Sequence, residues 1–298
     1  MVNKIGFHAR STEEFLRVIR IEGVDLVELK PQKFHEKNDA SIYYFDGEHF
    51  EVNEDLVKKI ARLCDGKGIT VQIHLPYEKT CDPSIEGGLC QAVRRHHGLI
   101  LARYAMFGEM LRKFGIGSVL TTHPPAFQFD GVPFCSEEDA LEIGAELYFK
   151  LDRLIKHQGY GFQVGIENVV APKSSGASSV GYTPKHIDQL IGNTSRIGIT
   201  VDTGHRRLND EMSIAKLFSY GQVVSLHFHS NPGEVSDENY DDDEHVFATP
   251  ENLPHYDRYM KGLRRRGLPI VLEIDKLDET TDDELGAYVR NLRSELGD

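Results

Sequence analysis

The stretch from Ile199 to His205, ITVDTGH, joins a strand-like segment to a carboxylate, a Thr-Gly turn and a histidine. A carboxylate at the end of an apolar strand is costly to bury unless a positive group lies beside it. The Asp-x-x-His spacing allows the turn to bring Asp202 and His205 to one point above the strand end. Taken alone, the segment favours an Asp that accepts turn N–H groups, with an incidental surface His. The same pattern recurs along the chain, however, and the recurrence changes that balance.

Short apolar runs, rich in Val and Ile and without polar alternation, predict parallel strands buried on both faces. Helix starts marked by Ser11, Ser136 and Thr183 lie between some of these runs. Eight strand–helix units predict an α/β fold, a single (β/α)8 TIM barrel over residues 1–298. A doubly wound open sheet is the alternative, which the lack of a Gly-rich phosphate loop disfavours. The predicted strands are Ile5–His8, Leu26–Leu29, Thr70–Leu75, Ser118–Thr122, Phe162–Glu167, Ile197–Asp202, Val223–His229 and Pro269–Ile274.

Composition bounds the class of protein. With 40% hydrophobic and 27% charged residues the chain is typical of a soluble globular protein. No apolar run approaches the ~20 residues that cross a bilayer, and no signal peptide is visible. The four cysteines form no C-x-x-C pair, so we expect reduced thiols, a cytoplasmic location and no evident protein partner. The formal net charge of −13 argues against broad non-specific nucleic-acid binding, although this count omits any bound metal.

The last six predicted strands each lead into a histidine or a carboxylate. A lone strand-end histidine is more often structural, but six such residues in succession on the catalytic face of a barrel favour a metal site. Three histidines and three carboxylates on one rim are electrostatically unfavourable without bound cations. This set of nitrogen and oxygen ligands suits zinc, with manganese or iron as alternatives. Asp243 and His245 point the same way in an extended stretch and could hold one more ion, unless the acidic run is a solvated loop. The six residues are His74, His123, Glu167, Asp202, His227 and Glu273.

On these motifs the chain resembles the endonuclease IV family of apurinic/apyrimidinic endonucleases (AP endonuclease family 2), within the broader xylose isomerase-like TIM barrels. The resemblance runs from His8 to Asp275, and it implies three zinc ions. One would be held by His74, His123 and Glu167. Glu167 would bridge to a second, held also by Asp202, His227 and Glu273, and the third would lie on His205, Asp243 and His245. The carrying motifs are IHLPY at 73–77, THP at 122–124, IEN at 166–168, VDTGH at 201–205, LHFH at 226–229 and DEH at 243–245.

The activity that this resemblance implies is cleavage of DNA on the 5′ side of abasic sites by a metal-activated hydroxide. Glu167 and Glu273 are the expected catalytic carboxylates. Where the family carries an Arg in the loop after the second strand this chain offers only Lys33, and VFATP at 246–250 replaces a Gly-rich turn. The expected substrate contacts are Tyr77, Lys33, Arg206 and His229.

The alternative function is a divalent-metal-dependent sugar or sugar-phosphate isomerase or epimerase. There one ion lies on Glu167, Asp202, His227 and Glu273, and the two glutamates move a proton as acid and base. The acidic net charge and the missing Arg favour this alternative. It leaves His74, His123, Asp243 and His245 without a metal role, so we rank the nuclease first, and a metal-binding scaffold without activity third. Three long connections, 31–50, 77–92 and 231–253, are expected on the same face.

Overall fold

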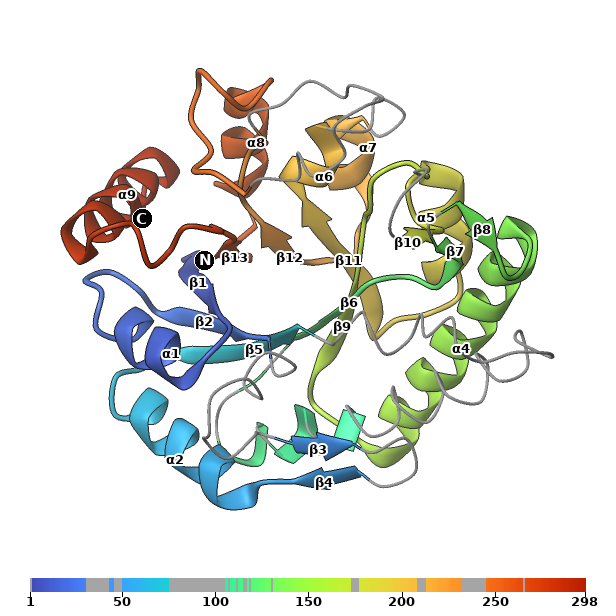
Figure 1. The fold of residues 1–298 in the computed structure, drawn as a ribbon, viewed down its shortest axis with the longest axis horizontal. Coiled ribbons are helices and arrows are strands. Elements are labelled where there is room, and N and C mark those ends of the chain that lie inside the picture. The colour runs from blue at the N-terminus through green and yellow to red at the C-terminus, as the bar shows by residue number, and fades with distance from the viewer. Residues whose placement is uncertain are drawn as a thin grey trace.

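The predicted strands close into a barrel of eight parallel strands, in the order β1-β13-β12-β11-β9-β6-β5-β2 (Figure 1). This is the fold that the sequence predicts. β12 and β13 each end two residues earlier than predicted, since Phe228 and His229 follow β12, and Glu273 and Ile274 follow β13. The barrel strands are β1 Lys4–Ala9, β2 Leu26–Leu29, β5 Thr70–His74, β6 Val119–Thr122, β9 Gln163–Glu167, β11 Ile197–Asp202, β12 Val223–His227 and β13 Pro269–Leu272.

The computed structural model describes residues 2–30, 43–45, 50–74, 105–106, 108–110, 112–114, 117, 119–129, 131–172, 177–207, 213–231, 245–264 and 266–298. Three predicted site residues, Lys33, Tyr77 and Asp243, lie outside these ranges. So do Cys81, Cys90 and most of the three long connections. Within the described part, Cys64 is a buried free thiol.

Helices surround the barrel (Figure 1). The three predicted helix starts are confirmed, because the side chains of Ser11, Ser136 and Thr183 each accept a hydrogen bond from a backbone N–H of the first turn. Among the described residues no helix is both long enough and apolar enough to span a membrane. The helices are α1 Thr12–Val18, α2 Glu54–Asp65, α4 Glu137–Gln158, α5 Pro184–Ile191, α6 Thr203–Arg207, α7 Ile214–Ser219, α8 Tyr256–Leu263 and α9 Asp282–Leu296.

Two small sheets were not predicted from the sequence. β7 Ala126–Phe129 pairs with β8 Val132–Pro133 and β10 Ala177–Ser179, and β3 Tyr43–Phe45 pairs with β4 Phe50–Val52. Their strands have two to four residues, too few to give a hydrophobic period. The first of these sheets is built from segments that follow β6 and β9, so it lies beside the carboxyl ends of those barrel strands.

A layer of polar residues fills the barrel one pleat below the strand ends. Side chains alternate along a strand, so a residue two positions before an inward-facing strand end also faces inward. Thr200 precedes Asp202 in this way, and Ser225 precedes His227. Five members of the layer are fully buried: Glu28, Gln72, Thr121, Thr200 and Ser225. The barrel interior therefore supports the strand-end residues with hydrogen-bonding groups as well as with apolar packing.

Candidate metal centre

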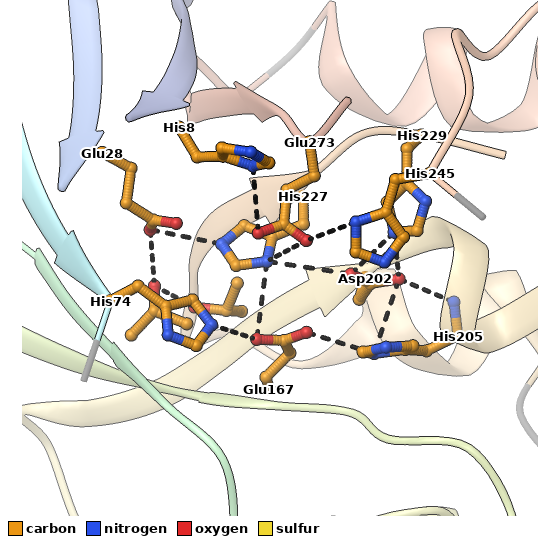
Figure 2. A network of polar contacts seen from close by, with 12 residues as sticks. His8, Glu28, His74, Glu167, Asp202, His205, His227, His229, His245 and Glu273 are labelled. Atoms are coloured by element: carbon orange, nitrogen blue, oxygen red, sulfur yellow. Dashed lines mark hydrogen bonds and ion pairs between the residues drawn. The ribbon is translucent and has the colours of Figure 1, made fainter. Parts of the chain in front are cut away.

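The residues at the carboxyl ends of the barrel strands converge on one point (Figure 2). Five of the six predicted strand-end residues are buried, while His123 is partly exposed. The structure therefore brings these six side chains together, although they come from strands far apart in the chain. Two further strands, β1 and β2, contribute His8 and Lys30, which the sequence analysis did not include in the site.

The Nδ1 atom of His227 lies at the centre of three carboxylates. It is 3.4 Å from Oε2 of Glu167, 3.7 Å from Oδ2 of Asp202 and 3.6 Å from Oε2 of Glu273. It is buried and has no hydrogen-bond partner among the described residues. Ligands about 2.1 Å from a tetrahedral zinc ion lie about 3.4 Å from one another. The four residues thus fit a divalent metal ion, with ligand atoms grouped as a metal would hold them.

The charges of this group also fit a cation. Burial lowers the affinity of His227 for a proton, but the carboxylates of Glu28, Glu273 and Glu167 outweigh burial and raise its pKa well above the ordinary value. Buried carboxylates that keep an imidazole protonated would also favour a divalent cation at that nitrogen. Because a ligating imidazole must lose that proton, protonation and metal binding compete.

Glu167 faces histidines on two sides. Its Oε2 is 3.2 Å from Nε2 of His74 and 3.4 Å from Nε2 of His123, while its Oε1 is 3.1 Å from Nδ1 of His205. Burial would raise the pKa of this carboxyl group, but the charges on His123 and His227 hold it well below the ordinary value. His74, His123 and Glu167 form a second group with metal-ligand spacing, as the resemblance to endonuclease IV implies.

Asp202 is held by two histidines. Its Oδ1 accepts a 2.6 Å hydrogen bond from the backbone N–H of His205, and Nε2 of His229 lies 3.0 Å from both of its carboxylate oxygens. Burial opposes ionisation, but the charges on His205 and His229 lower the pKa of Asp202 to about 2. The ring of His229 packs against Gly204, where an added Cβ would lie 2.0 Å from the ring. Gly204, which lies in α6 and not in the predicted Thr-Gly turn, therefore makes room for a buried histidine.

Glu273 lies beside a cation that the sequence analysis missed. Nζ of Lys30 is 2.6 Å from Oε1 of Glu273, and Nδ1 of His8 is 3.7 Å from the same oxygen. Burial lowers the pKa of His8 to about 3, so this imidazole is neutral. Burial also disfavours the charge on Lys30, but the carboxylates of Glu273 and Glu28 prevail and raise its pKa. Lys30 is therefore a fixed positive charge on one side of the centre.

His245 joins the centre from the segment that precedes α8. Its backbone N–H donates to Oδ2 of Asp275, whose own N–H donates to the His245 carbonyl. This pair positions the imidazole with Nδ1 3.7 Å from Oε2 of Glu273 and its ring centroid 4.1 Å from that of His229. His229, His245 and Glu273 form a third group with metal-ligand spacing, and Glu28, His74, His227 and Glu273 form a fourth. Of the other expected substrate contacts, Arg206 is partly buried directly after His205 in the chain.

Two buried polar residues of the site, Glu28 and Asn168, were not among the predicted site residues, although Asn168 belongs to the IEN motif. Glu28 lies within the short apolar run of β2, and its Oε2 is 3.2 Å from Nε2 of His227. Asn168 exchanges hydrogen bonds with the backbone of Asp202, from its Oδ1 and its Nδ2. A carboxylate inside an otherwise apolar strand was the available clue to Glu28, since burial of such a group requires a partner.

The comparisons with known proteins agree with the barrel. A family model described as "Xylose isomerase-like TIM barrel" matches residues 16–292. No curated protein matches the sequence.

Many solved structures resemble the chain over nearly its whole length. D-psicose 3-epimerase from Clostridium cellulolyticum H10, solved with D-tagatose, has a TM-score of 0.66 and 11% identity, covering 98% of this chain and 99% of that one. An L-ribulose 3-epimerase has a TM-score of 0.62 and 14% identity, with coverage of 100% and 95%. The IOLI protein with a bound zinc atom has a TM-score of 0.65 and 11% identity, with coverage of 98% and 97%. At such low identities these likenesses establish the fold alone.

Proposed function

This chain belongs to the xylose isomerase-like TIM-barrel family, and from that premise we propose that it is a divalent-metal-dependent isomerase or epimerase of a small sugar or sugar phosphate. One observation carries the proposal. Nδ1 of His227 is buried between the carboxylates of Glu167, Asp202 and Glu273, with distances suited to a shared metal ion. These are the four residues that an isomerase with one ion requires.

The two glutamates suit proton transfer at a carbon next to a carbonyl group. Glu167 ends β9 and Glu273 follows β13, and two strands, β11 and β12, lie between β9 and β13 in the barrel. The two carboxylates therefore approach a substrate from different sides, so that one removes a proton and the other returns one. A bound divalent ion would supply a Lewis acid that withdraws charge from the substrate oxygens. Lys30 keeps Glu273 ionised and oriented through their 2.6 Å ion pair.

The similar structures support the isomerase or epimerase over the DNA endonuclease. Several are described as epimerases of ketoses, and one holds zinc. The sequence analysis ranked the DNA endonuclease first, and none of the compared structures cited here is described as a nuclease. The isomerase or epimerase, which was the alternative, is now the better supported of the two.

A phosphodiesterase with more than one ion remains the second candidate, because a specific observation favours it. His74 and His123 both face the same oxygen of Glu167, at 3.2 and 3.4 Å. This group has metal-ligand spacing, and an isomerase with one ion gives it no metal to hold. The spacing suits zinc, and it is the arrangement that a bridging Glu167 would require.

The first experiment tests proton transfer directly. The protein is loaded in turn with zinc and manganese and incubated in D2O with ketopentoses, ketohexoses and their phosphates, and replacement of carbon-bound hydrogen by deuterium is followed by NMR. We expect exchange with the wild type and its loss in Glu167→Gln and Glu273→Gln. His74→Ala serves as the matched control and should keep most of the exchange, because an isomerase with one ion does not use His74 as a ligand.

The second experiment tests the competing function with the same proteins. An oligonucleotide with one abasic site is incubated with wild type, His74→Ala and His245→Ala beside an undamaged strand. The proposed isomerase should leave both strands intact. Cleavage at the abasic site that falls at least ~100-fold in both variants, with no deuterium exchange on any sugar, would replace the proposal by the nuclease.

A further inference from the structure

Glu28 is a fully buried carboxylate that neither functional hypothesis uses. It lies on β2, on the far side of the His227 ring from Glu167, Asp202 and Glu273 (Figure 2). Its Oε2 is 3.2 Å from Nε2 of His227, whereas the other three carboxylates surround Nδ1. The two nitrogens of one imidazole therefore face different sets of carboxylates.

The hydrogen on the His227 ring follows from this geometry. The carboxylate oxygen 3.2 Å from Nε2 favours the tautomer with its hydrogen on that nitrogen, because the N–H group can then donate to Glu28. The form of the ring that binds a metal is the neutral imidazole, and in this tautomer its lone pair is on Nδ1. That lone pair is aimed at the point shared by Glu167, Asp202 and Glu273, where a metal ion would lie.

Glu28 is itself held in place from the polar layer below. The hydroxyl group of Thr121 on β6 donates to Oε2 of Glu28 at 3.2 Å, and the side chain of Thr121 is fully buried. Oε1 of Glu28 is buried without a hydrogen-bond partner among the described residues. A buried carboxylate with so few partners is costly, and its contact with the metal-ligand histidine gives it a role.

We propose that Glu28 is a positioning residue that keeps the hydrogen of His227 on Nε2, so that Nδ1 alone faces the metal. The inference rests on the metal centre of the proposed function and is independent of the reaction. Without Glu28, the carboxylates around Nδ1 would attract the ring hydrogen to that nitrogen, which is the wrong tautomer for binding a cation. Partners of this kind orient ligating histidines, and their loss typically weakens metal affinity 10–100-fold.

The test measures zinc affinity by competition with a chelator. We expect Glu28→Gln to bind zinc ~10–100-fold more weakly than wild type. The glutamine amide can donate to Nε2 through its NH2 group or accept from it through its oxygen, so it no longer selects the tautomer with the hydrogen on Nε2. Thr121→Val should weaken binding by less. Ser225→Ala is the matched control, since Ser225 is equally buried two residues before His227 and bonds to Gln72. This control should bind zinc as wild type does.

A second measurement needs no variant, and so holds even if Glu28→Gln fails to fold. NMR of the zinc-loaded wild type with 15N-labelled histidine should identify Nδ1 of His227 as the metal-bound nitrogen and Nε2 as protonated. Metal bound through Nε2 would overturn the inference, as would wild-type zinc affinity in a folded Glu28→Gln. A wild type that binds no divalent ion would overturn the metal centre, and this inference with it. The first two outcomes would overturn the role of Glu28 alone, so the two failures are distinguishable.

Discussion

Replacing Gly204 by alanine should destabilise the protein through one contact, the ring of His229. An added Cβ would lie 2.0 Å from Cε1, 2.5 Å from Nδ1 and 2.7 Å from Nε2 of that ring. Carbon atoms in contact lie about 3.5–4.0 Å apart, so the overlap is at least ~1.5 Å. Either the ring moves or the α6 backbone shifts.

The ring of His229 has little freedom to move. It is fully buried, its Nε2 contacts both oxygens of Asp202, and its backbone exchanges hydrogen bonds with the Thr203 hydroxyl group. Overpacking of this kind costs about 1–3 kcal/mol. Loss of a hydrogen bond to a charged group costs a further ~1.5–3 kcal/mol if the ring is displaced. We expect Gly204→Ala to lower the free energy of unfolding by about 2–4 kcal/mol.

The double-mutant cycle with His229→Ala makes this reasoning refutable. Once the ring is absent, the added methyl group has space, so the double variant should be no less stable than His229→Ala alone. The coupling measured by urea unfolding of metal-free protein should then equal the cost of Gly204→Ala alone, about 2–4 kcal/mol. Gly221→Ala is the control, because nothing described lies within 4 Å of its added Cβ. If the destabilisation of the double variant equals the sum of the two single destabilisations to within ~0.5 kcal/mol, the proposed clash is refuted.

Three further predictions concern stability. Asp152→Asn should cost about 1–3 kcal/mol at pH 7, because the buried carboxylate accepts two backbone N–H groups, from Ser195 and Arg196. Burial raises the pKa of Asp152, but Lys156 and the two N–H groups lower it overall, so the stability that the carboxylate provides is present above the ordinary carboxyl pKa and is lost below it. In urea unfolding, the difference in free energy of unfolding between wild type and Asp152→Asn should shrink below about pH 4, and a difference that stays constant would contradict this. Thr281→Ala, which breaks the capping box of α9, should cost ~1 kcal/mol in the same assay, and no cost would mean that the cap is dispensable. Zinc at 100 times its Kd should add about 2.7 kcal/mol of stability that a chelator removes, and an unchanged Tm would argue against a metal centre.

The sequence predicted the barrel well because the buried strands are short and mainly apolar, and because Ser11, Ser136 and Thr183 mark helix starts with side chains that cap them. Such signals are local. The small sheet of β7, β8 and β10 has no comparable signal, since its strands are very short and pair through contacts distant in the sequence.

The candidate metal-ligand residues at the strand ends were predictable for a different reason. Each ends or follows a recognisable strand, so the barrel topology alone brings them to one rim. Glu28 was missed because it lies inside its strand, where a sequence does not show whether a side chain faces the barrel axis or the helices. His229 was expected to contact substrate, and the structure places it fully buried against Asp202. That position depends on the space left by Gly204, which no spacing rule conveys.

The number of metal ions and the reaction are linked through Glu167. Its Oε2 lies between two sets of imidazoles, since Nε2 of His74 is 3.2 Å away and Nδ1 of His227 is 3.4 Å away. If ions lay on both sides, this carboxylate would bridge them, and its lone pairs would be engaged too fully for it to act as a base. If a single ion lay beside His227, Oε1 would be left to Nδ1 of His205, at 3.1 Å, and to a substrate proton. Under the two hypotheses we therefore expect one ion per chain for proton transfer and more than one for phosphodiester cleavage. Elemental analysis of the wild type beside His74→Ala tests this expectation before any substrate is known.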